Sequence, residues 1–236
     1  MIHRDIDVVI LCGGQGTRLR NTVNNRPKSM ALIKEKPFLD IVLGQFYRQG
    51  FRRFILCTGF MGQFIYDYYR NSKYAKYIFY SEEKIPLGTG GAVKKAEKLI
   101  KSENFFVANG DSYCRINLQK FTTFHLSLAD GLVSMALAMR DARADGGGVS
   151  LNDDFLISSF AEKNSFVSYP YINAGIYIFN KKALSLIRSG QPSSLEYDIF
   201  PEMVGKNIFG FVVEDRVYDI GTPERYKKFL KVFKSF

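Results

Sequence analysis

The stretch Asp7-Val8-Val9-Ile10-Leu11-Cys12-Gly13-Gly14-Gln15-Gly16-Thr17-Arg18-Leu19 decides the fold class of this 236-residue chain. Its first half is a short apolar run, which predicts a strand buried on both faces of a parallel sheet. Its second half is a glycine-rich turn, where backbone N–H groups can approach an anion because no Cβ intrudes. A strand followed by such a turn predicts a phosphate site, although a simple tight turn explains the glycines alone equally well.

The details of this turn exclude two large nucleotide-binding classes. No Gly-Lys-Ser/Thr ends the run, so it is not a Walker A loop, and Leu19 stands where the dinucleotide fingerprint has its third glycine. Arg18 and Lys28 both lie on the polar segment 17–37, which we expect to be a long loop. Two cations near a glycine-rich turn suit a triphosphate. We therefore predict a site for a nucleoside triphosphate.

Apolar runs and helical patterns alternate through the rest of the first half. This alternation predicts a parallel α/β sheet with right-handed crossovers. The second half is expected to extend that sheet, partly antiparallel, and to end in a helix capped by Thr222. The fold class is α/β: a three-layer, Rossmann-like sheet, mixed but mainly parallel, flanked by helices. Strands are expected at 7–12, 54–58, 77–80, 105–108, 132–139, 149–151, 155–161, 177–179 and 211–213, and helices at 38–50, 63–70, 88–101 and from Pro223.

Composition narrows the classes of partner. The net charge is +10, but the basic residues are scattered, and the aromatic–glycine pattern of an RNA-binding sheet is missing. No apolar run approaches the ~18 residues that a membrane span needs, and the N-terminus does not resemble a signal peptide. We expect a cytoplasmic protein without nucleic-acid or membrane partners. Three cysteines without metal-ligand spacing, Cys12, Cys57 and Cys114, are expected to be buried structural residues.

Further motifs extend over almost the whole chain. They are Pro86-Leu87-Gly88-Thr89-Gly90-Gly91, Asn109-Gly110-Asp111, Phe160-Ala161-Glu162-Lys163, Asn173-Ala174-Gly175-Ile176-Tyr177 and Asp219-Ile220-Gly221-Thr222-Pro223. Together with the glycine-rich turn and Arg26-Pro27-Lys28-Ser29-Met30 they resemble, in the same order, the motifs of the sugar-nucleotide pyrophosphorylases, which transfer a nucleotidyl group to a sugar 1-phosphate. Ser29 and Asn164 depart from the commoner family pattern, which bears on the subfamily more than on the reaction.

The resemblance implies a role for each matching residue. It implies a single domain, 1–236, with a nucleotide-binding half at 1–115 and a sugar-phosphate-binding half at 116–236. Catalytic roles fall to Arg18, Lys28, Asp111 and Lys163, and Mg²⁺ would be held by Asp111 and Asp219. The implied nucleotide-binding residues are Leu11, Gly13, Gly14, Gly16, Thr17, Arg18, Glu83, Gly88, Thr89 and Gly110, and the implied sugar-binding residues are Glu162, Lys163, Asn173, Gly175 and Glu196.

Several of these residues also have a purely structural interpretation. Asp111 and Asp219 could serve as turn residues, and Glu162 with Lys163 could form a surface ion pair. Glu196 could be an ordinary helical residue after a capping serine. A glutamate can accept hydrogen bonds from guanine, but Glu82 and Glu83 are both candidates for this contact.

The substrate implied by the resemblance is narrower than the residues alone allow. Within the family the chain is most similar to the D-glycero-D-manno-heptose 1-phosphate guanylyltransferases, which implies GTP, the heptose phosphate and a role in surface polysaccharide synthesis. Mannose 1-phosphate guanylyltransferases and N-acetylmuramate 1-phosphate uridylyltransferases are alternatives. A glycosyltransferase is disfavoured because Asp111-Ser112-Tyr113 breaks the Asp-x-Asp pattern. A non-catalytic nucleotide-sensing module is a further alternative. The sequence does not indicate the oligomeric state.

Overall fold

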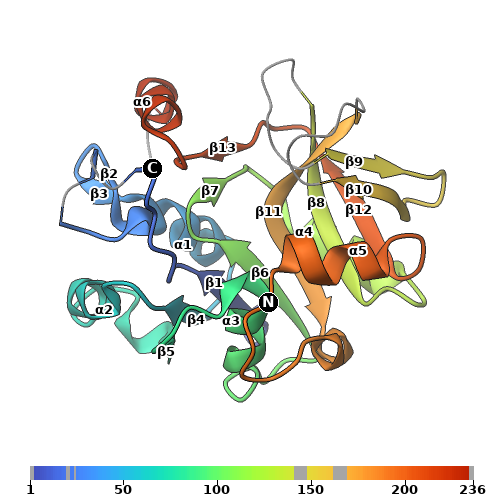
Figure 1. Ribbon diagram of the computed structural model, residues 1–236, viewed down its shortest axis with the longest axis horizontal. Helices are drawn as coiled ribbons and strands as arrows, with labels where there is room; N and C mark the ends of the chain where they lie inside the picture. The colour runs from blue at the N-terminus through green and yellow to red at the C-terminus, as the bar shows by residue number, and fades with distance from the viewer. Residues whose placement is uncertain (1–2, 20–21, 24, 141–147, 162–168, 234–236) are drawn as a thin grey trace.

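The computed structural model describes residues 3–19, 22–23, 25–140, 148–161 and 169–233. Among these residues, a nine-stranded sheet runs through the molecule in the order β10-β9-β11-β6-β1-β4-β5, with β8 beside β11 and β12 beside β8 (Figure 1). Its strands are β1 (Asp7–Leu11), β4 (Arg53–Thr58), β5 (Ile78–Glu82), β6 (Asn104–Asn109), β8 (Val133–Met139), β9 (Gly148–Leu151), β10 (Ile157–Ala161), β11 (Tyr171–Asn180) and β12 (Ile208–Val213).

Two short ladders lie apart from this sheet, and helices connect the strands. The ladders pair β2 (Leu32–Ile33) with β3 (Lys36–Pro37), and β7 (Ser112–Tyr113) with β13 (Tyr218–Asp219). The α-helices are α1 (Phe38–Arg48), α2 (Gly62–Tyr69), α3 (Gly88–Ala96), α4 (Leu118–Ser127), α5 (Phe200–Met203) and α6 (Pro223–Val232), with a π-helical turn at Leu195–Ile199 and 3-10 turns at Lys28–Met30, Ala75–Tyr77 and Lys181–Leu186.

The first half of the chain forms a parallel set of four strands, and β8 and β12 of the second half form a further parallel pair. Strand β1 pairs in parallel with β4 and β6, and β4 pairs in parallel with β5. The carboxyl ends of these strands therefore meet at one edge, which is where open α/β sheets bind ligands. At that edge Gly110 N–H donates to the Leu11 carbonyl (2.9 Å) and Cys12 N–H donates to the Cys57 carbonyl (3.1 Å).

The second half joins the sheet through β11. Residues Ile176–Asn180 of this strand pair antiparallel with β6, whereas residues Tyr171 and Ile172 pair with β9. The register against β8 shifts between Asn173 and Tyr177, where the strand bulges. The bulge redirects β11 at the edge that carries the loops after β1 and β6.

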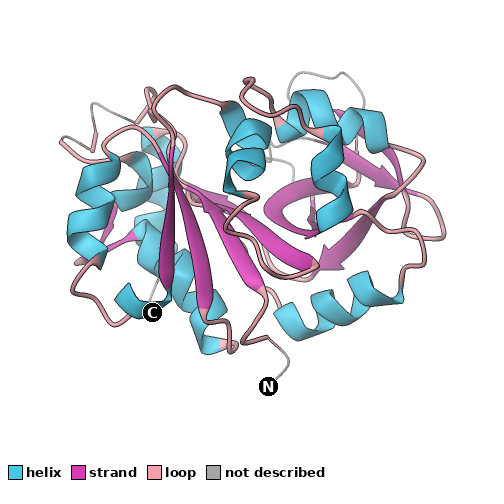
Figure 2. Ribbon diagram, turned by 90° about the horizontal axis from the view of Figure 1, so that it is seen from below, coloured by secondary structure: helices cyan, strands magenta, loops and turns pink. Residues whose placement is uncertain are grey.

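Helices cover both faces of the sheet (Figure 2). Alternate residues of β1 serve opposite faces: Val8 and Ile10 pack in one apolar cluster with residues of α1, α2, α4 and α6, and Val9 packs in a second with residues of α3 and α5. This period of two follows from the pleat of a strand that is buried on both sides. The predicted three-layer α/β class is confirmed.

The local predictions were correct in part. The last helix starts as expected, since Arg225 N–H donates to Thr222 Oγ1 (3.4 Å). Helix α3, however, ends at Ala96 and not at Lys101, because the chain turns there to bury Ile100 and to bring the N–H of Lys101 onto Asp7 Oδ2 (2.7 Å). Helix α4 was not predicted, and segment 17–37 contains the β2–β3 hairpin and a 3-10 turn.

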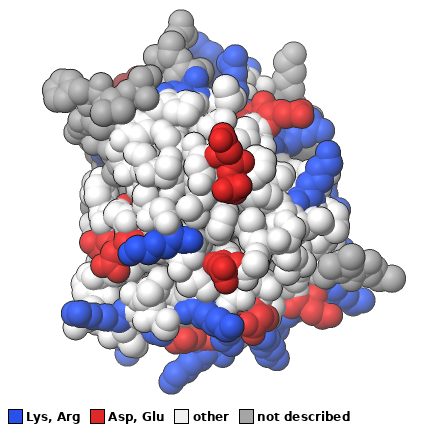
Figure 3. Space-filling model, turned by 90° about the vertical axis from the view of Figure 1, so that its right-hand side faces the viewer, with Lys and Arg blue, Asp and Glu red and all other residues white. Residues whose placement is uncertain are grey.

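The surface and the cysteines agree with the composition. On the face shown in Figure 3, basic and acidic side chains are interspersed around wide uncharged areas. Within the described ranges, no helix combines the length and the apolarity that a bilayer crossing requires. The three cysteines are buried and unpaired, as expected.

Candidate nucleotide-binding site

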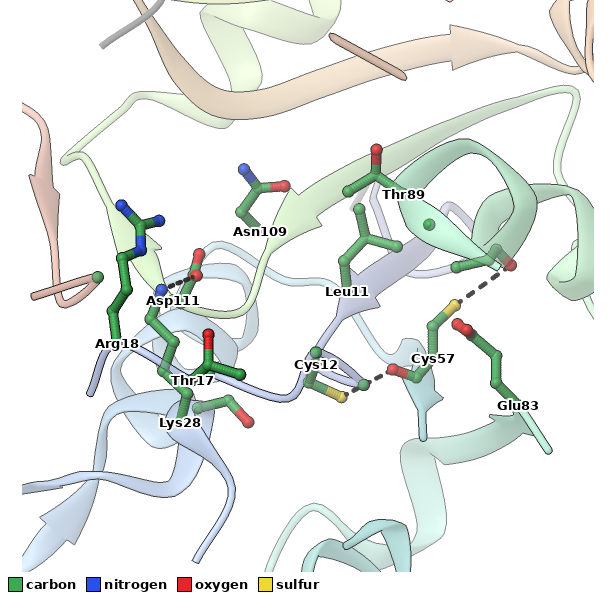
Figure 4. A pocket seen from close by; sticks show the side chains of 17 residues that line it. Leu11, Cys12, Thr17, Arg18, Lys28, Cys57, Glu83, Thr89, Asn109 and Asp111 are labelled. Atoms are coloured by element: carbon green, nitrogen blue, oxygen red, sulfur yellow. Dashed lines mark hydrogen bonds and ion pairs between the residues drawn. The ribbon is translucent and has the colours of Figure 1, made fainter. Parts of the chain in front are cut away.

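A cavity of about 360 Å³ opens at the carboxyl ends of β1, β4 and β6 (Figure 4). One end carries the charged side chains of Arg18, Lys28 and Asp111, and Glu83 lies at the other end. The lining residues are Leu11, Cys12, Gly13, Gly14, Gly16, Thr17, Arg18, Lys28, Ser29, Cys57, Glu83, Gly88, Thr89, Ala92, Asn109, Asp111 and Gly221.

The glycine-rich turn offers a run of backbone donors to this cavity. Among the described residues, none of the N–H groups from Gly13 to Arg18 donates a hydrogen bond to the protein. Such a run of N–H groups beyond a strand is a site that favours an anion. In contrast, Gly90 and Gly91 N–H at the start of α3 both donate to the Ser193 carbonyl (2.8 and 3.2 Å). Phosphate binding is therefore expected at the first turn and not at the start of α3.

Packing explains two of the three glycines in the first turn. A Cβ on Gly13 would lie 2.9 Å from the Gly59 nitrogen, and a Cβ on Gly16, whose φ is +59°, would lie 2.7 Å from Lys28 Cβ. These glycines let the turn lie against the loop after β4 and against the segment that carries Lys28. A Cβ on Gly14 would meet nothing within 4 Å, so open space surrounds that position.

The charged end of the cavity is organised by an ion pair. Lys28 Nζ lies 2.5 Å from Asp111 Oδ2, although 83 residues separate the two in the chain. Burial works to raise the pKa of Asp111, but the ammonium of Lys28 and its hydrogen bond outweigh that effect and lower the pKa. Asp111 is therefore an anion at neutral pH. The side chain of Arg18 is exposed beside this pair (Figure 4).

Asp219 lies close to the same pair because β13 pairs with β7. Asp219 is opposite Ser112 in this ladder, and Ile220 N–H donates to the Asp111 carbonyl (3.1 Å). The point that a Cβ on Gly221 would occupy is 2.8 Å from Asp219 Oδ1 and 3.4 Å from Lys28 Nζ. Glycine at this position thus keeps the space between Asp219 and Lys28 open.

Two neighbouring carboxylates fit the donor set of Mg²⁺, which proteins commonly hold through one or two carboxylates together with substrate phosphates. The described residues contain no group of three or more His, Cys, Asp or Glu side chains placed to hold a metal without a substrate. Asp219 is also a partner of Arg225, whose Nη1 lies 3.0 Å from each carboxylate oxygen. A divalent ion at Asp219 would therefore share or displace this guanidinium.

The opposite end of the cavity is an apolar slot that contains one carboxylate. The slot is formed by Cys12, Cys57 and Ala92, and Glu83 faces it, whereas Glu82 is exposed and does not line the cavity. Glu83 Oε2 accepts from Leu87 N–H (2.9 Å), which leaves further lone pairs on the carboxylate. Burial raises the pKa of Glu83, partly offset by this bond.

Three of the predicted sugar-binding residues, Asn173, Gly175 and Glu196, lie beside the cavity. Asn173 Oδ1 accepts from Gly175 N–H (2.9 Å) across the bulge of β11. Gly175 has φ +71°, and a Cβ there would lie 2.9 Å from Nδ2 of Asn109, which lines the cavity. Glu196 reaches the cavity through a hydrogen bond with Thr89 (2.7 Å). Glu162 and Lys163 lie outside the described residues.

Sequence reasoning and the cavity differ at several positions. Gly110 does not line the cavity, because it packs against Leu11, and its neighbour Asn109 takes that place. Asn109 belongs to the motif Asn109-Gly110-Asp111, so the sequence did carry a signal for this cavity residue. Three other lining residues that were missed, Cys12, Ser29 and Gly221, also lie inside the motif stretches, whereas Cys57 and Ala92 lie outside them and had no local signal.

Comparisons with known proteins agree with this arrangement. The model of the nucleotidyl transferase family matches residues 7–233. A D-glycero-alpha-D-manno-heptose 1-phosphate guanylyltransferase of Aneurinibacillus thermoaerophilus is 34% identical over 98% of this chain and 100% of that protein, and one of Campylobacter jejuni is 34% identical over 95% and 99%. The crystal structure of HddC from Yersinia pseudotuberculosis complexed with GMP-PN superposes with a TM-score of 0.84, at 34% identity, over 97% of this chain and all of that one. The chain therefore belongs to the nucleotidyl transferase family.

Proposed function

We propose that this protein transfers a guanylyl group from GTP to D-glycero-D-manno-heptose 1-phosphate and releases pyrophosphate. The observation that carries the proposal is the two-ended cavity, with unused backbone N–H donors, Arg18 and Lys28 at one end and an apolar slot with Glu83 at the other. Its volume, about 360 Å³, is within the range of small-molecule sites. A nucleoside triphosphate fits this polarity, with phosphates at the cationic end and the base in the slot.

The choice of base and sugar is supported by the relatives. Two relatives of similar length carry the heptose guanylyltransferase name. The similar structure of HddC was solved in complex with GMP-PN. A mannose 1-phosphate guanylyltransferase of Mycobacterium tuberculosis is 30% identical over 96% of this chain, which makes mannose 1-phosphate the second candidate. The proposal extends to a cytoplasmic role in the synthesis of bacterial capsule or lipopolysaccharide.

The reaction needs no protein nucleophile. A phosphate oxygen of the sugar 1-phosphate forms a bond with the α-phosphorus, while the bond from that phosphorus to the bridging oxygen breaks and pyrophosphate leaves with the electron pair. Arg18 and the N–H groups of the first turn hold the β- and γ-phosphates, and Lys28 stabilises charge at the α-phosphate. Lys163 is proposed to hold the sugar phosphate. Asp111 and Asp219 would hold Mg²⁺, which when bound neutralises phosphate charge.

Turnover is the direct test of the reaction. The protein with Mg²⁺ is incubated with each of four nucleoside triphosphates and a panel of sugar 1-phosphates that includes the heptose and mannose compounds, and pyrophosphate is measured. We expect the fastest release with GTP and the heptose phosphate. Fastest release with mannose 1-phosphate would replace the sugar assignment. No release from any pair would refute catalysis and leave the nucleotide-sensing module.

Two substitutions test the site assignment. D111N should lower the rate by about 10²–10³, the usual effect of removing one preorganised electrostatic group from such a site, because it removes a charge that would hold Mg²⁺ and that pairs with Lys28. D130N, at an exposed acid on the same chain, should have no effect. E83Q should raise the KM for GTP at least about tenfold, because a buried guanine contact is lost. Near-normal rates for D111N, or an unchanged preference for GTP in E83Q, would contradict the respective role.

A further inference from the structure

The segment 191–196 is bound along the start of helix α3, far from it in sequence. Ser193 N–H donates to the Leu87 carbonyl (2.8 Å), and the Ser193 carbonyl accepts from Gly90 and Gly91 N–H. A Cβ on Gly90 would lie 2.5 Å from Ser193 Oγ, and a Cβ on Gly91 would lie 2.9 Å from the Gln191 carbonyl. Because these residues are glycines, the segment 191–196 can pack directly against the start of α3. The two segments form one hydrogen-bonded unit.

The hydroxyl of Thr89 is the side-chain link in this unit. It accepts from Leu195 N–H (2.8 Å) and donates its proton to Glu196 Oε2 (2.7 Å). Ser194 Oγ donates to the same oxygen (3.0 Å), so two hydroxyls hold Oε2. Within the described part of the chain, Oε1 of Glu196 accepts no hydrogen bond. One oxygen of the carboxylate is fixed by the protein, and the other can accept from a ligand hydroxyl.

Thr89 also lines the nucleotide cavity, together with its neighbour Gly88. We propose that Thr89 is a positioning residue for the second substrate: it borders the nucleotide cavity and holds Glu196 for a hydroxyl of the sugar phosphate. This inference rests on the proposed function. Its physical basis is pre-organisation, since a carboxylate that already has a fixed oxygen loses little freedom when it binds a sugar hydroxyl. The partner class is a polyhydroxylated sugar phosphate.

Kinetics with two variants, T89V and T89S, test the role of the hydroxyl. T89V removes the hydroxyl and keeps the shape, and T89S keeps the hydroxyl. We expect T89V to raise the KM for the sugar phosphate about 10- to 100-fold, with less than about a threefold change in the KM for GTP, and T89S to restore the wild-type value. T123V, at an exposed threonine of α4, is the matched control. Equal effects on both KM values, or a T89S that behaves like T89V, would overturn the proposal.

A double-mutant cycle tests whether Thr89 acts through Glu196. In the E196Q background, T89V should add less than about a threefold further change, because the carboxylate that Thr89 positions is already lost. Fully additive effects would overturn the coupling. Absence of turnover by the wild-type protein would refute the proposed function and would be seen before any variant is compared.

A structural readout keeps the inference testable without turnover. Hydrogen–deuterium exchange of a peptide covering 191–198 should be faster in T89V than in the wild type and T89S, because the Leu195 N–H loses its acceptor. T123V should match the wild type. Unchanged exchange in T89V would show that Thr89 does not hold this segment and would overturn the inference.

Discussion

Protonation of His125 is opposed by the fold, and the cost can be worked from its surroundings. The side chain is 3% exposed, with Nδ1 2.8 Å from Ser134 Oγ and Nε2 3.1 Å from Asn104 Oδ1. The Asn104 oxygen also accepts from Asn180 Nδ2 (3.1 Å). Because this oxygen only accepts, Nε2 carries the proton of the neutral ring, and Nδ1 accepts from Ser134. Burial lowers the pKa of His125 to about 4.

The lowered pKa makes the free energy of unfolding depend on pH. An unfolded histidine titrates near 6.5, so below that pH the unfolded chain takes up a proton that the native chain does not. The stability from the neutral ring is complete above pH 6.5, decreases as the pH falls, and reaches its limit below about 4. At pH 5 the loss is about 2 kcal/mol, a substantial share of the roughly 5–15 kcal/mol that stabilises a typical domain.

The comparison of wild type and H125Q isolates the contribution of His125 to the pH dependence of the free energy of unfolding. Urea unfolding at pH 7.5 and pH 5 should show that the wild type loses about 2 kcal/mol more than H125Q, because the carboxylates titrate in both proteins. The chain has two histidines, so an NMR titration assigns His125 by the signal missing in H125Q. Equal acid losses in the two proteins, or an NMR pKa above 6, would refute the reasoning.

Two further predictions concern the strands around the site. D7A should lower the free energy of unfolding by about 3–5 kcal/mol, because the fully buried Asp7 accepts from Arg53 Nε (2.8 Å) and from the two N–H groups of residues 101–102. Urea unfolding measures this loss. The control D5A, at an exposed acid, should change the free energy of unfolding by less than about 0.5 kcal/mol. G175A should lower stability by about 1–3 kcal/mol and weaken GTP binding in a calorimetric titration, because its Cβ would displace Asn109. G190A, also at positive φ but with nothing within 4 Å of the added Cβ, should lower stability without changing GTP affinity, and equal affinity losses in both variants would contradict this account.

Local chemistry made much of the fold predictable. The apolar run before Gly13 specified a strand buried on both faces, and the alternation that follows it specified a parallel α/β sheet. Thr222 and Pro223 specified the start of α6, because capping depends only on neighbouring backbone groups. Helix α4 was missed although Asn117 Oδ1 accepts from Lys120 N–H as a cap, since its apolar residues did not form a pattern that stood out from the preceding segment.

The sequence by itself determined the strand, the glycine-rich turn and the cations near it, because these depend on residue type and spacing along a few neighbouring positions. Only the tertiary structure decided which residues meet: Lys28 with Asp111, and Thr89 with Glu196 across 107 positions. It also decided that Glu83, and not Glu82, faces the cavity. Such contacts depend on the register of the strands and on how closely loops approach one another, and no local pattern in the chain specifies either.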